Sequence, residues 1–191
     1  GLDRVSSNGG TRLDSLHQAA ASSNVVHLAH PRIGPRKADD RVVYQRSTDD
    51  TLLEVVLLES DEPGVEQITR ALFEYADLDA IHLVSHGSDG SLLLGNQTLD
   101  SSSLEAHEEF LATWGGALST DGDLLIYGCD VAATEAGEAF IDTLAALTGA
   151  DVAASEDRTG HESLGGDWEL EYRAGSIEAD LVATAFTQDT W

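Results

Sequence analysis

The chain has 191 residues, 41% of them hydrophobic, and a formal net charge of −25 at pH 7. This length and apolar content suit one globular domain, and no apolar run approaches the roughly 18 residues of a membrane-spanning helix. An acidic chain repels nucleic acid and anionic lipid, so we expect neither as a partner and no membrane insertion. The single cysteine, Cys129, excludes an internal disulfide and leaves a free thiol to explain.

The first 40 residues are predicted to form an irregular basic arm, with one weak apolar piece at 25–29. The arm contains HPRIGPRK, which includes Arg32, Arg36 and Lys37. Residues 1–46 hold seven basic and four acidic side chains, whereas the remainder holds three basic and 31 acidic ones. The arm could therefore dock on an acidic body as a plug, or be cut as a substrate; a plain linker is the alternative.

From residue 41 the pattern changes to strands that alternate with helices. Strands are predicted at RVVYQ, LLEVVLLE, DAIHLVS (79–85), DLLIYG (123–128), DVAAS (151–155) and DWELEY (167–172), with a hairpin at 92–99. Helices are predicted after Pro63, after Ser102 and over 133–148. The alternation predicts one α/β domain over residues 41–191, a three-layer α/β/α sandwich with a mostly parallel sheet.

Two of the predicted strands end in chemically reactive residues. IHLVSHG runs into His86 and Gly87, and LLIYGC runs into Cys129. Functional groups collect beyond the carboxyl ends of parallel strands, and neighbouring strands lie about 4.8 Å apart. If these two strands are neighbours, we expect the imidazole and the thiol to emerge side by side.

Such a pair has the parts of a nucleophilic cysteine. An imidazole can take the thiol proton and later return it to a leaving amine. The amino end of the helix expected after Cys129 favours an anion, and the N–H groups of Gly87 and Cys129 could hold an oxyanion. Taken alone, however, Cys129 suits a buried inert thiol, and His86 suits a structural histidine.

The motif SHGSDG closely resembles the His-Gly motif of the caspase, legumain and gingipain group of cysteine peptidases. YGCDVAATEAG resembles the cysteine motif of that group in its placement, without the QAC-x-G signature of caspases. The resemblance implies a caspase-like fold in which His86 is the general base, Cys129 the nucleophile and Gly87 an oxyanion donor.

The same resemblance implies a place for the substrate-binding residues. Tyr127 would line the pocket for the residue before the scissile bond, and Ser155, Glu156 and Asp157 would form another wall. The acids in that wall would favour an Arg or Lys in the pocket. Asp130 could bind substrate or cap the following helix.

Over residues 52–178 the chain also resembles an uncharacterised domain near the amino ends of giant bacterial surface adhesins. The motifs that carry the resemblance include DLDAIHLVSHGSDGSLLLGN, LLIYGCDVAA and LGGDWELEY. It implies a secreted or surface-attached bacterial protein. The resulting hypothesis is a cysteine endopeptidase that processes its own parent chain, and the alternative is a non-catalytic module of an adhesin.

Metal-dependent readings have weaker support in the sequence. His82 and His86, with Cys129 or His161, could hold zinc, but no CxxC or HExxH spacing is present. The acids at 121–123 and 156–157 could bind calcium as an activator, although they fit no EF-hand loop. We therefore expect no required cofactor.

Two further residues near the predicted dyad have competing interpretations. Ser85 is an unpromising serine nucleophile because the G-x-S-x-G elbow is absent. Asp89 could orient His86 or simply stabilise a turn. Farther away, Trp114, Phe140 and Trp168 are predicted to be core residues.

Overall fold

The computed structural model describes residues 25–31, 42–46, 51–160 and 162–181. Its strands are β1 (Val25–Pro31), β2 (Val42–Arg46), β3 (Thr51–Leu57), β4 (Leu78–Val84), β5 (His86–Ser88), β6 (Ser91–Leu94), β7 (Gln97–Asp100), β8 (Leu118–Tyr127), β9 (Asp151–Ala154) and β10 (Tyr172–Ala174). Its helices are α2 (Gly64–Leu72), α3 (Glu108–Ala117) and α4 (Glu135–Thr148), with short 3₁₀ turns at Glu105–His107 and Glu162–Leu164. In these ranges no helix has the length and apolar character needed to cross a membrane.

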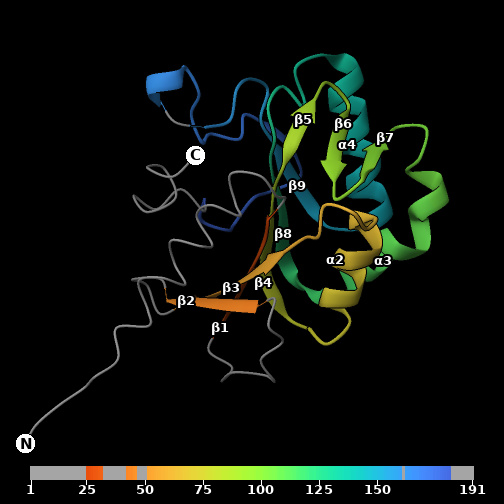
Figure 1. Cartoon of the computed structure of the whole chain (residues 1–191), viewed down its shortest axis with the longest axis vertical. Helices are drawn as coiled ribbons and strands as arrows, with labels where there is room; N and C mark the ends of the chain where they lie inside the picture. Colours follow the sequence, from red (N-terminus) through yellow and green to blue (C-terminus); the bar gives the residue numbers. More distant parts are fainter. Residues whose placement is uncertain (1–24, 32–41, 47–50, 161, 182–191) are drawn as a thin grey trace, which may run out of the picture.

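A seven-stranded sheet in the order β10-β9-β8-β4-β1-β3-β2 forms the centre of the domain. β4 pairs with β8, and β8 with β9, in parallel, whereas the other neighbouring pairs are antiparallel. A separate three-stranded sheet, β5-β6-β7, lies at one end of the domain (Figure 1). The predicted α/β class is confirmed, but the sheet is mixed, with parallel pairing confined to its centre.

β1 corrects the prediction that residues 1–40 are an irregular arm. It lies between β4 and β3 and pairs with both, and Val25, Val26 and Leu28 are buried. A strand with two partners draws its stability from the hydrogen bonds and packing on both sides, which a short apolar run does not reveal. The predicted cut sites at Arg32, Arg36 and Lys37 lie outside the described residues.

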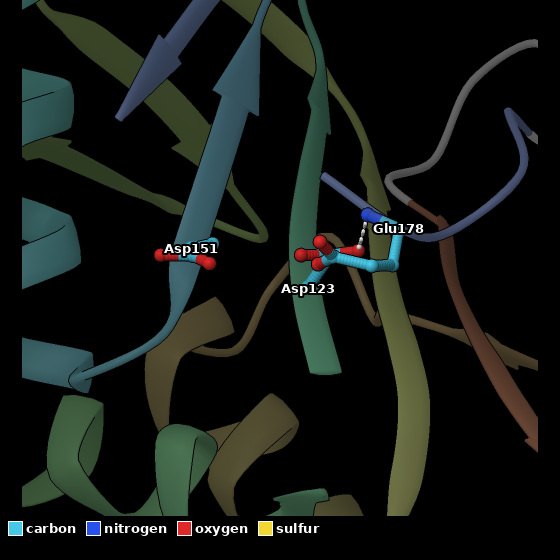
Figure 2. Close-up of side chains that lie close together, drawn as sticks. All are labelled: Asp123, Asp151 and Glu178. Atoms are coloured by element: carbon cyan, nitrogen blue, oxygen red, sulfur yellow. Dashed lines mark hydrogen bonds between the residues drawn. The ribbon is translucent and has the colours of Figure 1, made fainter. Parts of the chain in front are cut away.

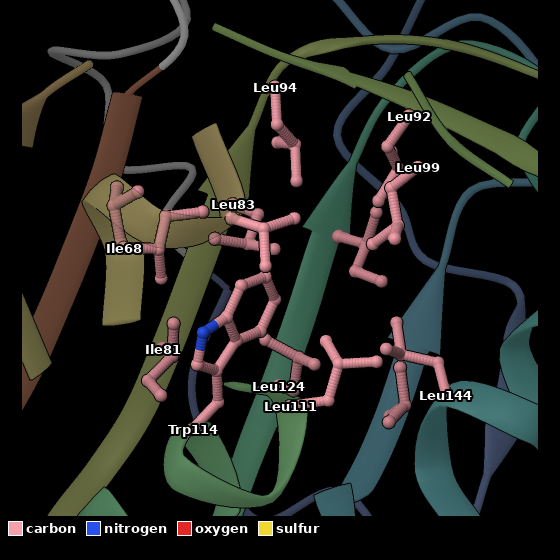
Figure 3. Packing of buried hydrophobic residues seen from close by; sticks show 14 of the residues in the cluster. Ile68, Ile81, Leu83, Leu92, Leu94, Leu99, Leu111, Trp114, Leu124 and Leu144 are labelled. Atoms are coloured by element: carbon pink, nitrogen blue, oxygen red, sulfur yellow. The ribbon is translucent and has the colours of Figure 1, made fainter. Parts of the chain in front are cut away.

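The three helices pack on one face of the sheet (Figure 1). Apolar residues of the helices meet Ile81 and Leu83 of β4 and Leu124 of β8, and Trp114 lies at the centre of this cluster (Figure 3). The indole of Trp114 is fully buried and donates a hydrogen bond to Thr69 Oγ1 at 2.8 Å. The prediction that Trp114, Phe140 and Trp168 belong to the core is confirmed.

The second face of the sheet is covered by the irregular C-terminal segment rather than by a described helix. Trp168 and Leu170 pack there against Leu125 and Tyr127 of β8. The predicted strand at 167–172 is wrong, because regular pairing begins only at Tyr172, which packs against the helix-face core. The described part of the chain therefore does not confirm a three-layer sandwich.

Several local predictions can be compared directly with the structure. The hairpin is confirmed: Leu94 pairs with Gln97, and Gly95 has a φ of +61° in its turn. α2 begins directly after Pro63, as predicted, and no described side chain, including those of Ser60 and Asp61, caps its first turn. Gln67 instead bonds the backbone of residues 59 and 62, which ties the first turn of the helix to its entry loop.

Two buried histidines face each other on the second face of the sheet. His27 of β1 and His82 of β4 are register partners, and each has an Nδ1 without a hydrogen-bond partner among the described residues. Burial lowers the pKa of His27 to about 4. Burial, together with the charge of His27, lowers the pKa of His82 well below its usual value. Both imidazoles are therefore neutral in the folded domain at pH 7.

This pair predicts a loss of stability in mild acid. These histidines take up a proton near pH 6.5 in the unfolded chain but not in the folded one. Each of them therefore lowers the free energy of unfolding by about 1.4 kcal/mol per pH unit below that value. For His27 the loss continues to about pH 4. We expect His82→Phe, which keeps a ring beside Tyr127, to flatten the profile between pH 7 and 5. Urea unfolding of the wild type and of His82→Phe at each pH measures the free energy of unfolding. Parallel pH profiles of the two proteins would contradict the prediction.

Candidate functional site

The ends of β4 and β8 bring the predicted catalytic residues to one edge of the sheet. Val84 is the register partner of Tyr127, and Ser85 N–H continues the pairing by donating to Tyr127 O at 3.0 Å. His86 and Cys129 therefore each follow the last paired residues by two positions. The expectation that their strands are neighbours is confirmed.

Two glycines allow these strand extensions to come together. A Cβ on Gly87 would lie 2.5 Å from Val131 Cγ2 and 3.1 Å from Cys129 O. A Cβ on Gly128 would lie 3.4 Å from the Cα of Gly87. The two backbones are thus in van der Waals contact, and this close approach is a structural reason for glycine in both SHG and GC.

The thiol and the imidazole follow neighbouring strands, but they are not hydrogen-bonded to each other in the described structure. Cys129 is half-buried, and its thiol donates a hydrogen bond to Thr159 O, with an Sγ–O distance of 3.7 Å. His86 is exposed at the start of β5. The backbone N–H of Cys129 donates to no described residue, so it is available to an oxyanion.

Residues 130–134, directly after the cysteine, are tied to the loops on either side. On one side Gly90 N–H donates to Val131 O at 2.9 Å. On the other, Asp130 N–H donates to Asp157 O at 2.6 Å and Ala132 N–H to Ser155 O at 3.0 Å. Three strand ends, those of β5, β8 and β9, therefore form one connected rim around Cys129.

Asp89 bonds a residue outside its own turn, and Asp130 does not cap the following helix. Asp89 accepts bonds from Thr134 N at 3.0 Å and Thr134 Oγ1 at 2.7 Å, so it holds the start of α4 and does not orient His86. Thr134, and not Asp130, caps α4. Asp130 instead has a φ of +58°, a left-handed conformation that is uncommon outside glycine and that recurs at functional sites.

The helix after the cysteine begins later than predicted. α4 starts at Glu135, six residues beyond Cys129, and its first turn carries Glu135 and Glu138. The field of a helix amino end falls off within the first turn. The helix therefore does not directly follow the cysteine, as the expected support of a thiolate assumed.

The predicted substrate-binding residues divide into buried and exposed sets. Tyr127 is fully buried, with its ring centroid 6.0 Å from His82 and 5.9 Å from Trp168, so in this conformation it packs in the core and lines no open pocket. Ser155 is also buried and bonds the backbone of Asp157. Glu156 and Asp157 are exposed on the rim.

The rim is strongly acidic near Asp157. Desolvation, followed by the charges of Asp167, Glu171 and Asp130, raises the pKa of Asp157. Carboxylate oxygens of Asp157, Asp167 and Glu171 lie within 4.8 Å of one another, and all three residues are exposed. This concentration of negative charge attracts cationic groups to the rim.

The zinc interpretation receives no geometric support from the described residues. His82 is buried on the second face while His86 is exposed at the rim, and the two described groups that could hold a metal contain only carboxylates. His161 lies outside the described residues. Ser85 is buried and its hydroxyl bonds His86 O, which leaves it unsuited to attack a substrate.

The sequence indicated Asp123 as a possible calcium ligand but did not reveal the second acidic group to which it belongs. Asp123 of β8, Asp151 of β9 and Glu178 of the C-terminal segment have carboxylate oxygens within 4.8 Å of one another. Burial is the main cause that raises the pKa of Asp123, and the charges of Glu178 and Asp151 add to it. The β8–β9 register could have indicated the Asp pair, but nothing in the sequence places Glu178 beside it.

Comparison with known protein families gives one match. Residues 38–191 match the model of a family described as a domain of unknown function, DUF4347. The match begins after β1, although β1 lies in the middle of the sheet. No curated protein and no solved structure matches the chain.

Proposed function

Since the chain belongs to this family of domains of unknown function, we propose an activity from its own residues: a cysteine endopeptidase that uses His86 and Cys129. The observation that supports it is the register of β4 and β8, which puts an exposed imidazole and the only thiol at equivalent positions beyond neighbouring strand ends. Residues 43 positions apart in the sequence thereby share one edge.

The proposed chemistry needs a rotation of the Cys129 side chain. The Sγ of Cys129, which now points toward Thr159 O, must turn toward His86, which accepts its proton. The thiolate then attacks the scissile carbonyl carbon, and the backbone N–H of Cys129 stabilises the oxyanion, aided by Gly87. The imidazolium gives its proton to the leaving amine, and water hydrolyses the remaining thioester to regenerate the thiol.

Charge at the rim supports a basic residue before the cut bond. Asp130, Glu156 and Asp157 are exposed around Cys129, and carboxylates pair well with the guanidinium of Arg or the ammonium of Lys. The basic stretch with Arg32, Arg36 and Lys37 is a candidate substrate in the same chain. We propose self-processing of a secreted or surface-attached bacterial protein as the use of this activity.

The test of this proposal is the intact mass of the full chain over time. We expect the wild type to lose a fragment at neutral pH while Cys129→Ala stays whole, and the fragment mass names the residue before the cut. Arg32→Ala and Arg36→Ala should each remove a cut at its own position and leave other cuts unchanged. If the intact mass of both the wild type and Cys129→Ala stays unchanged over time, and the wild type cleaves no member of a peptide library, the result would argue against a peptidase.

A non-catalytic binding module is the second candidate. The observation that favours it is the hydrogen bond from Cys129 Sγ to Thr159 O in a half-buried position, which is the arrangement of a structural thiol. In that case the acidic rim would bind a basic segment without cutting it. The mass experiment separates the two, because only a peptidase loses its fragment in a Cys129-dependent way.

A further inference from the structure

Three carboxylates meet where the first residue of β9 pairs with the middle of β8. Asp123 and Asp151 are register partners in these parallel strands, and Glu178 arrives from the C-terminal segment. Figure 2 shows Glu178 beside Asp123, with the backbone N of Glu178 bonded to the Asp123 carboxylate. An acidic cluster alone is common on protein surfaces, so the buried member decides what this one does.

Asp123 is fully buried, and only one of its carboxylate oxygens is satisfied. Its Oδ2 accepts two backbone N–H bonds, from Glu178 at 2.9 Å and from Ala179 at 2.7 Å. Its Oδ1 has no accessible surface and no hydrogen-bond partner among the described residues. An unpaired buried carboxylate oxygen is costly, and here the adjacent groups are two more acids.

The C-terminal segment is fitted closely over this cluster. Gly175 has a φ of +116°, and a Cβ added to it would collide with the carboxylate of Asp151. The backbone therefore passes directly over Asp151 before it delivers Glu178 to Asp123. The repulsion between acids packed this closely under a chain segment is relieved by a bound cation or by protonation of a carboxyl group.

We propose that Asp123, Asp151 and Glu178 bind a calcium-class divalent cation, which fastens the C-terminal segment to the sheet. Carboxylate oxygens are the ligands of hard cations, and Ca²⁺ lies about 2.3–2.6 Å from each of six to eight oxygens. Two oxygens on opposite sides of one Ca²⁺ are thus about 5 Å apart. One carboxylate oxygen from each of the three residues lies within 4.8 Å of the others, so all three can reach one such ion.

The cation gives the orphaned Oδ1 a partner and fixes the segment that covers the second face of the sheet. This segment includes Trp168 and Leu170, which pack on the face that contains Tyr127, two residues before Cys129. The proposal does not depend on catalysis at Cys129. The acids at the rim, Asp157, Asp167 and Glu171, are all exposed and carry no equivalent proposal.

The test is a calcium titration of the full chain, in which calorimetry measures binding and thermal unfolding measures stability. We expect one saturable site per chain and a rise in Tm of roughly 5–10 °C at calcium about 100-fold above its Kd. Glu178→Gln keeps the backbone N–H that donates a hydrogen bond to the Asp123 carboxylate. The C-terminal segment therefore stays attached to Asp123 while one carboxylate ligand of the cation is lost. Calcium binding should weaken at least ten-fold in Glu178→Gln and in Asp151→Asn.

Asp121→Asn is the matched control, because it makes the same charge change at an exposed position two residues before Asp123. It should bind calcium as the wild type does. Circular dichroism verifies that each variant is folded before titration. The proposal is overturned if the wild type shows no saturable site, if Glu178→Gln binds as tightly as the wild type, or if Asp121→Asn weakens binding equally.

Discussion

Gly115→Ala is expected to destabilise the domain by about 3 kcal/mol or more, whereas the same change at the next residue should be harmless. A Cβ on Gly115 would overlap the carbonyl oxygen of Thr148, the last residue of α4, and lie 2.7 Å from its carbonyl carbon. The obstacle is backbone at a helix end, so it cannot turn aside as a side chain could. The helices α3 and α4 would have to move apart over the core.

Gly116→Ala is the internal control for this prediction. Gly116 follows in the same helix, and a Cβ there meets nothing within 4 Å. Alanine is favoured over glycine in a helix by about 1 kcal/mol, so this variant should be as stable as the wild type or slightly more stable. Urea unfolding at pH 7 measures both, and a difference below about 1 kcal/mol between the variants would show that α3 and α4 are not packed this closely.

The sequence was most informative about the centre of the sheet. The strands at 79–85 and 123–128 are apolar, are followed by polar or glycine-rich turns and are separated by a helix, and this pattern specifies parallel neighbours. β4 and β8 are indeed paired in parallel. Because parallel strands end at the same edge, the juxtaposition of His86 and Cys129 followed from the sequence.

The elements outside the β4–β8 pair were less predictable, for physical reasons. β1 is a seven-residue strand flanked by polar, proline-containing sequence, and its place depends on long-range pairing with β3 and β4. At the other end, Trp168 and Leu170 alternate as a strand would, yet they cover the sheet in irregular backbone. Alternation reports which side chains are buried, not whether the backbone finds a pairing partner.

Side-chain directions at the candidate site could not be read from strand ends. Tyr127 is the last residue of β8, and the alternation of the strand turns it to the face that holds His82 and Trp168. The resemblance to a peptidase group placed it at a pocket instead. The start of α4 likewise lies two residues later in the chain than predicted, at Glu135.

His86→Ala is expected to slow alkylation of Cys129 by iodoacetamide at least ten-fold at pH 7. An unassisted cysteine is only a few per cent thiolate at this pH, whereas an imidazole that accepts the proton makes the thiolate a major species. The half-buried position of Cys129 gives the reagent partial access. Mass spectrometry of the full chain follows the rate, and the single cysteine makes the added mass unambiguous.

His107→Ala is the matched control, since this imidazole bonds Gln97 and Ser103 beside α3 and has no contact with the rim. Its alkylation rate should equal that of the wild type. A wild-type thiol that reacts only after unfolding would contradict the dyad and agree with the bond from Sγ to Thr159 O as its permanent state. Fast alkylation that depends on His86 would instead mean that the thiol leaves Thr159 readily, because a thiolate has no proton to donate to that carbonyl. The reactivity of one side chain thus distinguishes a poised nucleophile from a structural thiol at the same strand end.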